Sequence, residues 1–109
     1  MESKQAVSLM QTLLVNLLQQ RQWSAAAPIA KWLSVNGDEA ASALCPQIYN
    51  HLSLFDEALQ ALAMVPINMR RQPVVRRAEA VTLFELGYPQ LAKEVLLSAV
   101  SGDYREVAA

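Results

Sequence analysis

Two side chains in this sequence are the natural places to look for catalytic or metal chemistry. His51 follows Asn50 and could act as a general base or a metal ligand, but no carboxylate pair or nucleophile accompanies it in a recognisable motif. Cys45 precedes Pro46 and is the single cysteine of the chain, so it forms no internal disulfide. We therefore interpret His51 as a partly exposed histidine at a helix end and Cys45 as a buried structural thiol.

A third candidate is a cluster of four arginines that holds four of the nine positive charges. Such a cluster could contact an anion, an acidic partner or nucleic acid. No aromatic residue lies between the arginines to stack on bases, and a net charge of −1 gives no overall field to hold nucleic acid. We interpret the cluster as a solvated linker surface with some role in partner contact. Its members are Arg70, Arg71, Arg76 and Arg77.

The remaining signatures of catalysis are missing from the sequence. It contains no glycine-rich phosphate loop, no paired carboxylates at catalytic spacing and no cluster of Cys and His. We therefore expect no enzyme, no cofactor, no metal and no nucleic-acid partner. The N-terminus lacks the basic region of a signal peptide, and no apolar run reaches the length of a membrane span. A cytoplasmic protein without membrane insertion is the expectation.

Composition narrows the fold class to a helical one. Hydrophobic residues make up 53 % of the chain and charged residues 17 %, which excludes intrinsic disorder. Three glycines are too few for the turns of a β-sandwich or barrel. Apolar residues recur at spacings of three and four, and no segment alternates as a strand does. The predicted helices cover residues 5–21, 24–36, 39–52, 55–65, 73–87 and 89–101, with 67–72 as the linker, and the tail after them could add one more turn.

Helix-end signals support these boundaries. Asp38 is a good N-cap for the third predicted helix, and Glu39 is favoured in its first turn by the helix dipole. Gly37 is suited to end the second predicted helix because it adopts the left-handed conformation without a steric penalty. Pro73 and Pro89 fit the first turns of the last two helices, where a missing N–H costs nothing.

An internal repeat connects three of these helices. A bulky residue or proline is followed three positions later by alanine, and the three alanines are 32 and 34 residues apart. A helix pair with a period of about 34 residues is the signature of tetratricopeptide repeats. Ordinary helical packing also places apolar residues at such spacings, so chance remains the alternative. The three segments are Trp23-x-x-Ala26, Phe55-x-x-Ala58 and Pro89-x-x-Ala92.

The sequence therefore predicts an all-α fold in which residues 1–109 form a single tetratricopeptide-like domain. Its three degenerate helix pairs cover about residues 5–37, 38–66 and 73–101. We expect about six or seven helices in all. Stacking of such pairs produces a short right-handed superhelix with a concave groove.

Several segments resemble one family, the small tetratricopeptide-like chaperones of the needle subunit in bacterial type III secretion (the YscG class). The similarity begins at residues 29–33, Ile-Ala-Lys-Trp-Leu, and continues with Gly-Asp-Glu-Ala-Ala at 37–41. Phe-Asp-Glu-Ala-Leu at 55–59 is similar to the opening of the second repeat of that family. Leu-Phe-Glu-Leu-Gly at 83–87, with Leu91 and Ala92 after it, is similar to the third. The resemblance covers roughly residues 9–105.

This resemblance implies a function and a location. Members of that family bind the needle monomer in the bacterial cytoplasm, together with a small helical co-chaperone, and prevent its polymerisation before export. The amphipathic C-terminal helix of the needle subunit would lie in the concave groove. Such a chaperone exposes apolar surface when it is alone, which would explain the high apolar content of this chain.

Tetratricopeptide geometry indicates which residues would line that groove, because the first helix of each pair faces the concave side. Core packing is the alternative for every apolar member, and the small side chains of Ala40 and Ala43 are favoured as a groove floor. The predicted needle-subunit groove comprises Gln11, Val15, Leu18, Ala40, Ala43, Gln47, Asn50, Val74, Arg77, Val81 and Phe84. The wide apolar arc of the first helix predicts a co-chaperone face at Met10, Leu14, Val15 and Leu18.

A second function of a different class stays open. A generic tetratricopeptide adaptor would dock a peptide or helix of another partner reversibly. Adaptors that bind peptide termini commonly clamp them with Lys, Arg and Asn on the first helix of each pair. The predicted groove here is mostly Ala, Val, Leu and Phe with one Arg, which favours the chaperone. The least favoured hypothesis is a regulatory protein that binds nucleic acid through the arginine cluster.

Overall fold

The computed structural model describes residues 2–101, and within that range it is all-helical, with six α-helices, one short 3₁₀ helix and no strand. The all-α class predicted from the sequence is confirmed there. The possible turn after residue 101 lies outside the described residues. The helices are α1 (Glu2–Gln19), α2 (Trp23–Val35), α3 (Glu39–His51), α4 (Phe55–Met64), the 3₁₀ helix η1 (Ile67–Met69), α5 (Pro73–Glu85) and α6 (Pro89–Ser101).

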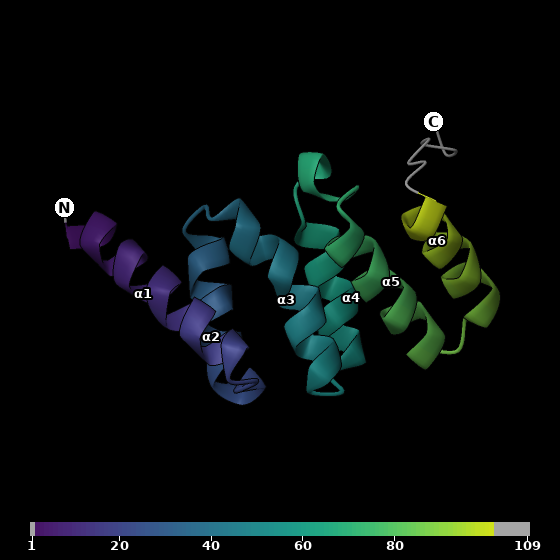
Figure 1. Ribbon diagram of the computed structural model, residues 1–109, viewed down its shortest axis with the longest axis horizontal. Helices are drawn as coiled ribbons and strands as arrows, with labels where there is room; N and C mark the ends of the chain where they lie inside the picture. Colours follow the sequence, from purple (N-terminus) through teal and green to yellow (C-terminus); the bar gives the residue numbers. More distant parts are fainter. Residues whose placement is uncertain (1, 102–109) are drawn as a thin grey trace.

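The six α-helices lie side by side in chain order along the longest axis of the molecule, from α1 at one end to α6 at the other (Figure 1). The result is an elongated body of 45 × 27 × 21 Å. Each helix packs against the next one in the chain, and α3 also packs against α5. The chain therefore has a central helix, α3, with neighbours on several sides.

Four helices end in the same backbone turn, in which one residue adopts a positive φ. At the end of α5, the N–H of Gly87 donates to the carbonyl of Phe84 at 3.1 Å, and the N–H of Tyr88 donates to Leu83 at 2.8 Å. This pair of hydrogen bonds is the Schellman motif, and it satisfies carbonyls that would otherwise lack partners. The positive-φ residues are Arg21 (56°), Gly37 (92°), Ser53 (60°) and Gly87 (97°).

Three of these turns repeat with the period of the sequence motif. Arg21, Ser53 and Gly87 are 32 and 34 residues apart, and each one joins the two helices of a pair. Two residues after each turn the second helix begins, and its fourth residue is a buried alanine. These alanines are Ala26, Ala58 and Ala92. The repeat found in the sequence therefore corresponds to a repeated element of backbone structure.

The start of α3 is fixed by Asp38, as its sequence position predicts. One carboxylate oxygen accepts a hydrogen bond from the N–H of Ala41 at 3.0 Å, which caps the helix. The other carboxylate oxygen accepts from the side-chain amide of Gln11 at 2.7 Å. Asp38 therefore ties α1 to the beginning of α3.

Most of the core lies around α3. The side chains of Ala26, Ala30 and Leu33 from α2 meet Ala41, Cys45 and Ile48 from α3, and Leu14 from α1 completes this cluster. A smaller cluster joins α3 to α5 and consists of Ala43, Val65 and Val75. Alanine supplies three of the seven residues of the larger cluster and one of the three in the smaller, and its small side chain lets helices approach closely.

The segment predicted as a linker, residues 67–72, is partly ordered as the 3₁₀ helix η1. Arg70 follows this helix and turns back toward the end of α4. Its Nε donates to the carbonyl of Val65 and its Nη2 donates to the carbonyl of Ala63, both at 2.9 Å. An arginine side chain thereby satisfies the last carbonyls of α4 and complements the negative end of the helix dipole.

The repeated turns predict opposite effects of two reciprocal substitutions. Ser53→Gly should raise the free energy of unfolding by about 0.5 to 1 kcal/mol, because serine is strained at positive φ and glycine is not. Gly87→Ser should lower it by a similar amount. A Cβ at Gly87 would meet no atom within 4 Å, so the loss reflects backbone conformation and not a clash. Urea denaturation followed by circular dichroism measures both, and equal stability of all three chains would contradict the prediction.

Candidate functional site

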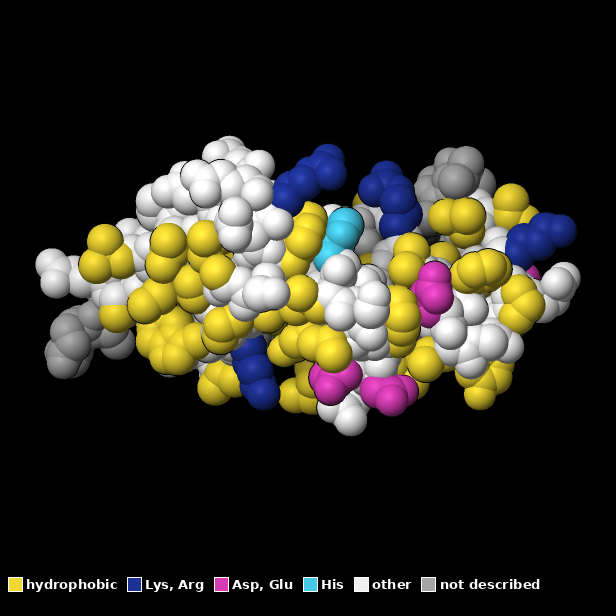
Figure 2. All heavy atoms as spheres, turned by 90° about the horizontal axis from the view of Figure 1, so that it is seen from below, with side chains coloured by type: hydrophobic (Ala, Val, Ile, Leu, Met, Phe, Trp, Pro, Cys, Tyr) yellow, Lys and Arg dark blue, Asp and Glu magenta, His cyan; other side chains and the backbone are white. Residues whose placement is uncertain are grey.

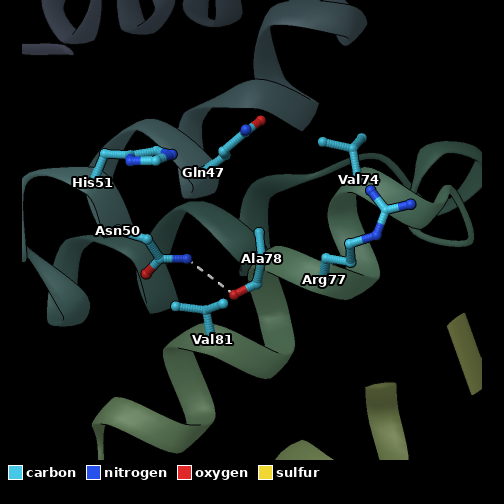
Figure 3. A pocket seen from close by; sticks show the side chains of 7 residues that line it. All are labelled: Gln47, Asn50, His51, Val74, Arg77, Ala78 and Val81. Atoms are coloured by element: carbon cyan, nitrogen blue, oxygen red, sulfur yellow. Dashed lines mark hydrogen bonds between the residues drawn. The ribbon is translucent and has the colours of Figure 1, made fainter. Parts of the chain in front are cut away.

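A cavity of about 250 Å³ lies between α3 and α5. Figure 3 shows α3 side chains on one side of it and α5 side chains on the other. The structure thus brings five residues of the predicted groove together, and it adds His51 and Ala78, which the sequence reasoning did not place in a groove. The lining residues are Gln47, Asn50, His51, Val74, Arg77, Ala78 and Val81.

A second cavity of about 510 Å³ extends from α5 to α6 and is largely apolar. It shares Arg77 and Val81 with the first cavity and adds Phe84, another residue of the predicted groove. Its far wall comes from α6, whose contribution was missed because only the first helix of each pair was expected to face a partner. The α6 residues are Pro89, Ala92, Lys93 and Leu96.

The four α5 residues of the predicted groove share one face of the helix, here called the α5 stripe: Val74, Arg77, Val81 and Phe84. Their spacings of three, four and three residues are those of a seam that packs against a second helix. Val81 is 46 % exposed and Phe84 is 61 % exposed. Val81 and Phe84 are therefore exposed apolar surface next to Arg77, whereas Val74 is partly buried against the cluster of Ala43, Val65 and Val75. Figure 2 shows hydrophobic side chains spread over much of one face of the molecule.

Asn50 lines the first cavity, but its amide also holds α3 to α5. Its Nδ2 donates to the carbonyl of Ala78 at 3.0 Å, drawn as the dashed line in Figure 3. The hydroxyl of Thr82 lies 2.9 Å from the Asn50 amide oxygen and 2.8 Å from the Ala78 carbonyl oxygen, and it can donate to either. Thr82 is fully buried, so this junction is a satisfied polar contact inside the helix interface.

The groove residues predicted at the N-terminal end do not join this site. Gln11, Val15 and Ala40 are exposed, but none of them lines the cavities beside α5. Gln11 instead uses its amide to bind the carboxylate of Asp38. The structure therefore concentrates the predicted groove residues on the second half of α3 and on α5.

Two predicted groove residues are corrected by their burial. Ala43 is 2 % exposed and lies in the core between α3 and α5, with Val65 and Val75. Its small side chain permits close helix packing and does not form a groove floor. Leu18 is partly buried against the core cluster around α2 and α3, so it also faces inward.

The predicted co-chaperone face on α1 contains one buried residue, two partly buried residues and one exposed residue. Leu14 is 4 % exposed, and Met10 and Leu18 are partly buried against the same core. Only Val15 of the four is exposed, at 53 %. The apolar arc of α1 spans two faces, and Met10, Leu14 and Leu18 belong to the inner one. The outer face carries Leu9 and Leu13, both of which are exposed.

The structure confirms the interpretations of His51 and Cys45. His51 is the last residue of α3 and is exposed, and its ring stacks on Trp23 with centroids 3.8 Å apart and planes 2° from parallel. Cys45 is buried, and loss of hydration raises the pKa of its thiol from 9.0 to about 11, against a smaller opposing effect of Lys31. Cys45 is therefore a protonated core side chain at neutral pH.

The arginines of the cluster make different contacts. Arg70 is exposed, as the interpretation of the cluster as a solvated surface implies, and it also caps α4. Arg76 donates to the carboxylate of Glu79 at 3.2 Å on the same helix. Arg77 is exposed and has no hydrogen-bond or ion-pair partner among the described residues. It is the member of the cluster that lines both cavities beside α5.

Another cavity, of about 670 Å³, lies between α2, α3 and α4. No residue of the predicted groove lines it, and its rim carries both signs of charge, from Lys31, Glu39 and Glu57. Its most exposed apolar side chains, Val35 and Met64, are well separated in sequence and do not form a continuous stripe along one helix. Val81 and Phe84, by contrast, are exposed apolar residues three positions apart on one helix.

Within residues 2–101, no group of three or more His, Cys, Asp or Glu side chains is placed to hold a metal ion. No helix in that range combines the length and the apolar character that crossing a membrane requires.

The hydrogen bonds between α3 and α5 predict that substitutions of Asn50 and Gln47 affect stability differently. Asn50→Ala should lower the free energy of unfolding by about 1 to 2 kcal/mol, because it removes the hydrogen bonds to Ala78 and Thr82. Gln47→Ala, on the same cavity wall, has no such bond to lose and serves as the control. Thermal and urea unfolding measure both variants. An Asn50→Ala chain as stable as the Gln47→Ala chain would contradict the role of the junction.

The buried thiol predicts slow chemical modification. With a thiol pKa of about 11 instead of 9.0, the folded chain should contain about 100-fold less thiolate at pH 8 than the unfolded chain. The reaction of Cys45 with iodoacetamide should therefore be slower by at least that factor, and it should accelerate in urea. The folded thiol stays protonated where the unfolded one ionises, so stability should also fall as the pH rises from 9 toward 11. Cys45→Ala should reduce that fall, and rapid labelling of the folded chain would refute the burial.

Comparison with known proteins gives the chain no relatives: no family model, no curated protein and no solved structure matches it.

Proposed function

We propose that this protein is a chaperone that binds an amphipathic helix of another protein along the α5 stripe and thereby prevents that protein from assembling prematurely. The observation that carries the proposal is the exposed apolar seam on α5, flanked on both sides by cavities. Val81 and Phe84 are large apolar side chains that remain exposed although the neighbouring helices are well packed. Exposed apolar patches of this kind mark sites of interaction with other proteins.

The geometry of the seam favours a helix as the ligand. From Val74 to Phe84 the helix advances by ten residues, which is a rise of about 15 Å, or nearly three turns. A ligand helix with apolar residues at the same spacing could insert its side chains into the cavities on either side. Complete burial of side chains such as Val81 and Phe84 contributes about 1.5 to 3 kcal/mol each before the cost of association. The arrangement suits a ligand that would otherwise bury the same face against copies of itself.

The resemblance of the sequence to the YscG class suggests the identity of the partners. The ligand would be the amphipathic C-terminal helix of a type III secretion needle subunit, held in the bacterial cytoplasm together with a small helical co-chaperone. In this proposal the three helix pairs form a short right-handed superhelix whose concave face includes the α5 stripe. The regular turns at Arg21, Ser53 and Gly87 support such a stacking of equivalent pairs. The exposed Leu9 and Leu13 on α1 replace the predicted co-chaperone residues as candidates for that contact.

The proposal is tested by co-expression of the chain with a needle subunit and the small helical protein encoded beside it. Size-exclusion chromatography with light scattering should show a complex of defined stoichiometry, in which the needle subunit stays unpolymerised. Phe84→Ser should weaken that complex by at least about tenfold, because it removes the most exposed large side chain of the seam. Its unfolding temperature should stay within a few degrees of the parent value, because the side chain contributes little to the core.

A matched control is Val35→Ser, which changes an apolar side chain of similar exposure beside the other cavity. It should leave the complex intact. A monomer that ignores both partners would overturn the chaperone proposal and leave the generic adaptor as the leading function. Equal loss of binding in both variants would show that the α5 stripe is not the site.

A further inference from the structure

The α5 stripe contains one charged side chain among apolar ones, and its charge is not balanced within the described part of the chain. Arg77 lies between Val74 and Val81 on the same helix face and has no ion-pair partner there. Glu79, the nearest acid on α5, binds Arg76. Glu85 is eight residues away, which corresponds to about 12 Å along the helix axis. Besides Arg77, the wall of the α5–α6 cavity carries Glu85 and Lys93, one charge of each sign.

A helix that covers this stripe would also cover the guanidinium. Removing an unpaired charge from water costs free energy. The flexible arginine side chain can extend toward solvent, but this recovers only part of the lost hydration. An entirely apolar ligand would therefore lose part of the free energy that Val81 and Phe84 provide. A ligand that brings a carboxylate to Arg77 would recover that loss through a charge-assisted hydrogen bond, which the planar guanidinium can make with two parallel N–H groups.

We propose that Arg77 selects ligand helices that carry an aspartate or glutamate within their apolar face, at the position opposite it. This inference rests on the proposed function, because it concerns the same stripe and the same class of ligand. It adds a criterion of specificity: the uncovered arginine disfavours purely apolar helices and helices with a cation at that position. The binding partner is an amphipathic helix with an acidic residue on its apolar face.

The test uses synthetic 21-residue amphipathic peptides with leucine at every apolar-face position except the central one. That position is Glu, Gln or Lys in three peptides, and a compensating change on the polar face keeps their net charge equal. Amidated C-termini remove the terminal carboxylate as an alternative partner of Arg77. Fluorescence anisotropy of the labelled peptides measures their dissociation constants with the full chain.

We expect the Glu peptide to bind about fivefold more tightly than the Gln peptide, and the Lys peptide to bind most weakly. Arg77→Gln should abolish the difference between the Glu and Gln peptides. Lys4→Gln removes the same charge from an exposed position at the start of α1 and should preserve the difference. Arg77→Glu should reverse the order of the Glu and Lys peptides, which a general loss of folding would not do.

Two outcomes overturn different statements. If all three peptides bind with equal affinity, or if Arg77→Gln leaves the preference intact, the selectivity assigned to Arg77 is wrong while the helix-binding function stands. If none of the peptides binds, the helix-binding function itself is contradicted.

Discussion

The close approach of the two helices in each pair depends on one small side chain, the alanine at the fourth position of the second helix. Ala26, Ala58 and Ala92 are all buried, and each lies five residues after a left-handed turn. A larger side chain at any of these positions would push the paired helices apart, because protein cores leave little free volume. The turn sets the direction of the returning helix and the alanine sets its distance. Together the turn and the alanine determine the geometry of the three helix pairs.

The helix boundaries were predictable because the signals are local. Asp38 provides a cap, and Pro73 and Pro89 stand at first helical positions, so the predicted and observed starts of α3, α5 and α6 agree. The start of α1 was placed three residues too late, because no capping residue or proline marks it. The ordered turn in the linker was not predictable, because it depends on Arg70 reaching back to carbonyls of α4.

The candidate site was predictable only in part, for a geometric reason. Spacings of three and four residues place side chains on one face of a helix, but they do not tell which face meets the core. On α5 the face chosen by repeat register includes Val81 and Phe84, which are exposed, as a surface that binds a partner must be. On α3 the same reasoning selected Ala43, and on α1 the wide apolar arc suggested Leu14, yet both residues are buried. An apolar arc wider than half the circumference contains both kinds of position, and only packing separates them.

The arrangement of helices in a row also has a consequence for how the chain folds and opens. Nearly all packing is between neighbours in the chain, so contacts close short loops and folding should be fast. The central α3 contacts α2, α4, η1 and α5, whereas α1 packs mainly on α2 and α6 on α5. Opening α6 breaks mainly its interface with α5, and opening α1 breaks its interface with α2 and its contacts with the start and core face of α3. Amide protons in α1 and α6 should therefore exchange with solvent when these end helices open locally. Those in α3 should exchange only when the whole chain unfolds.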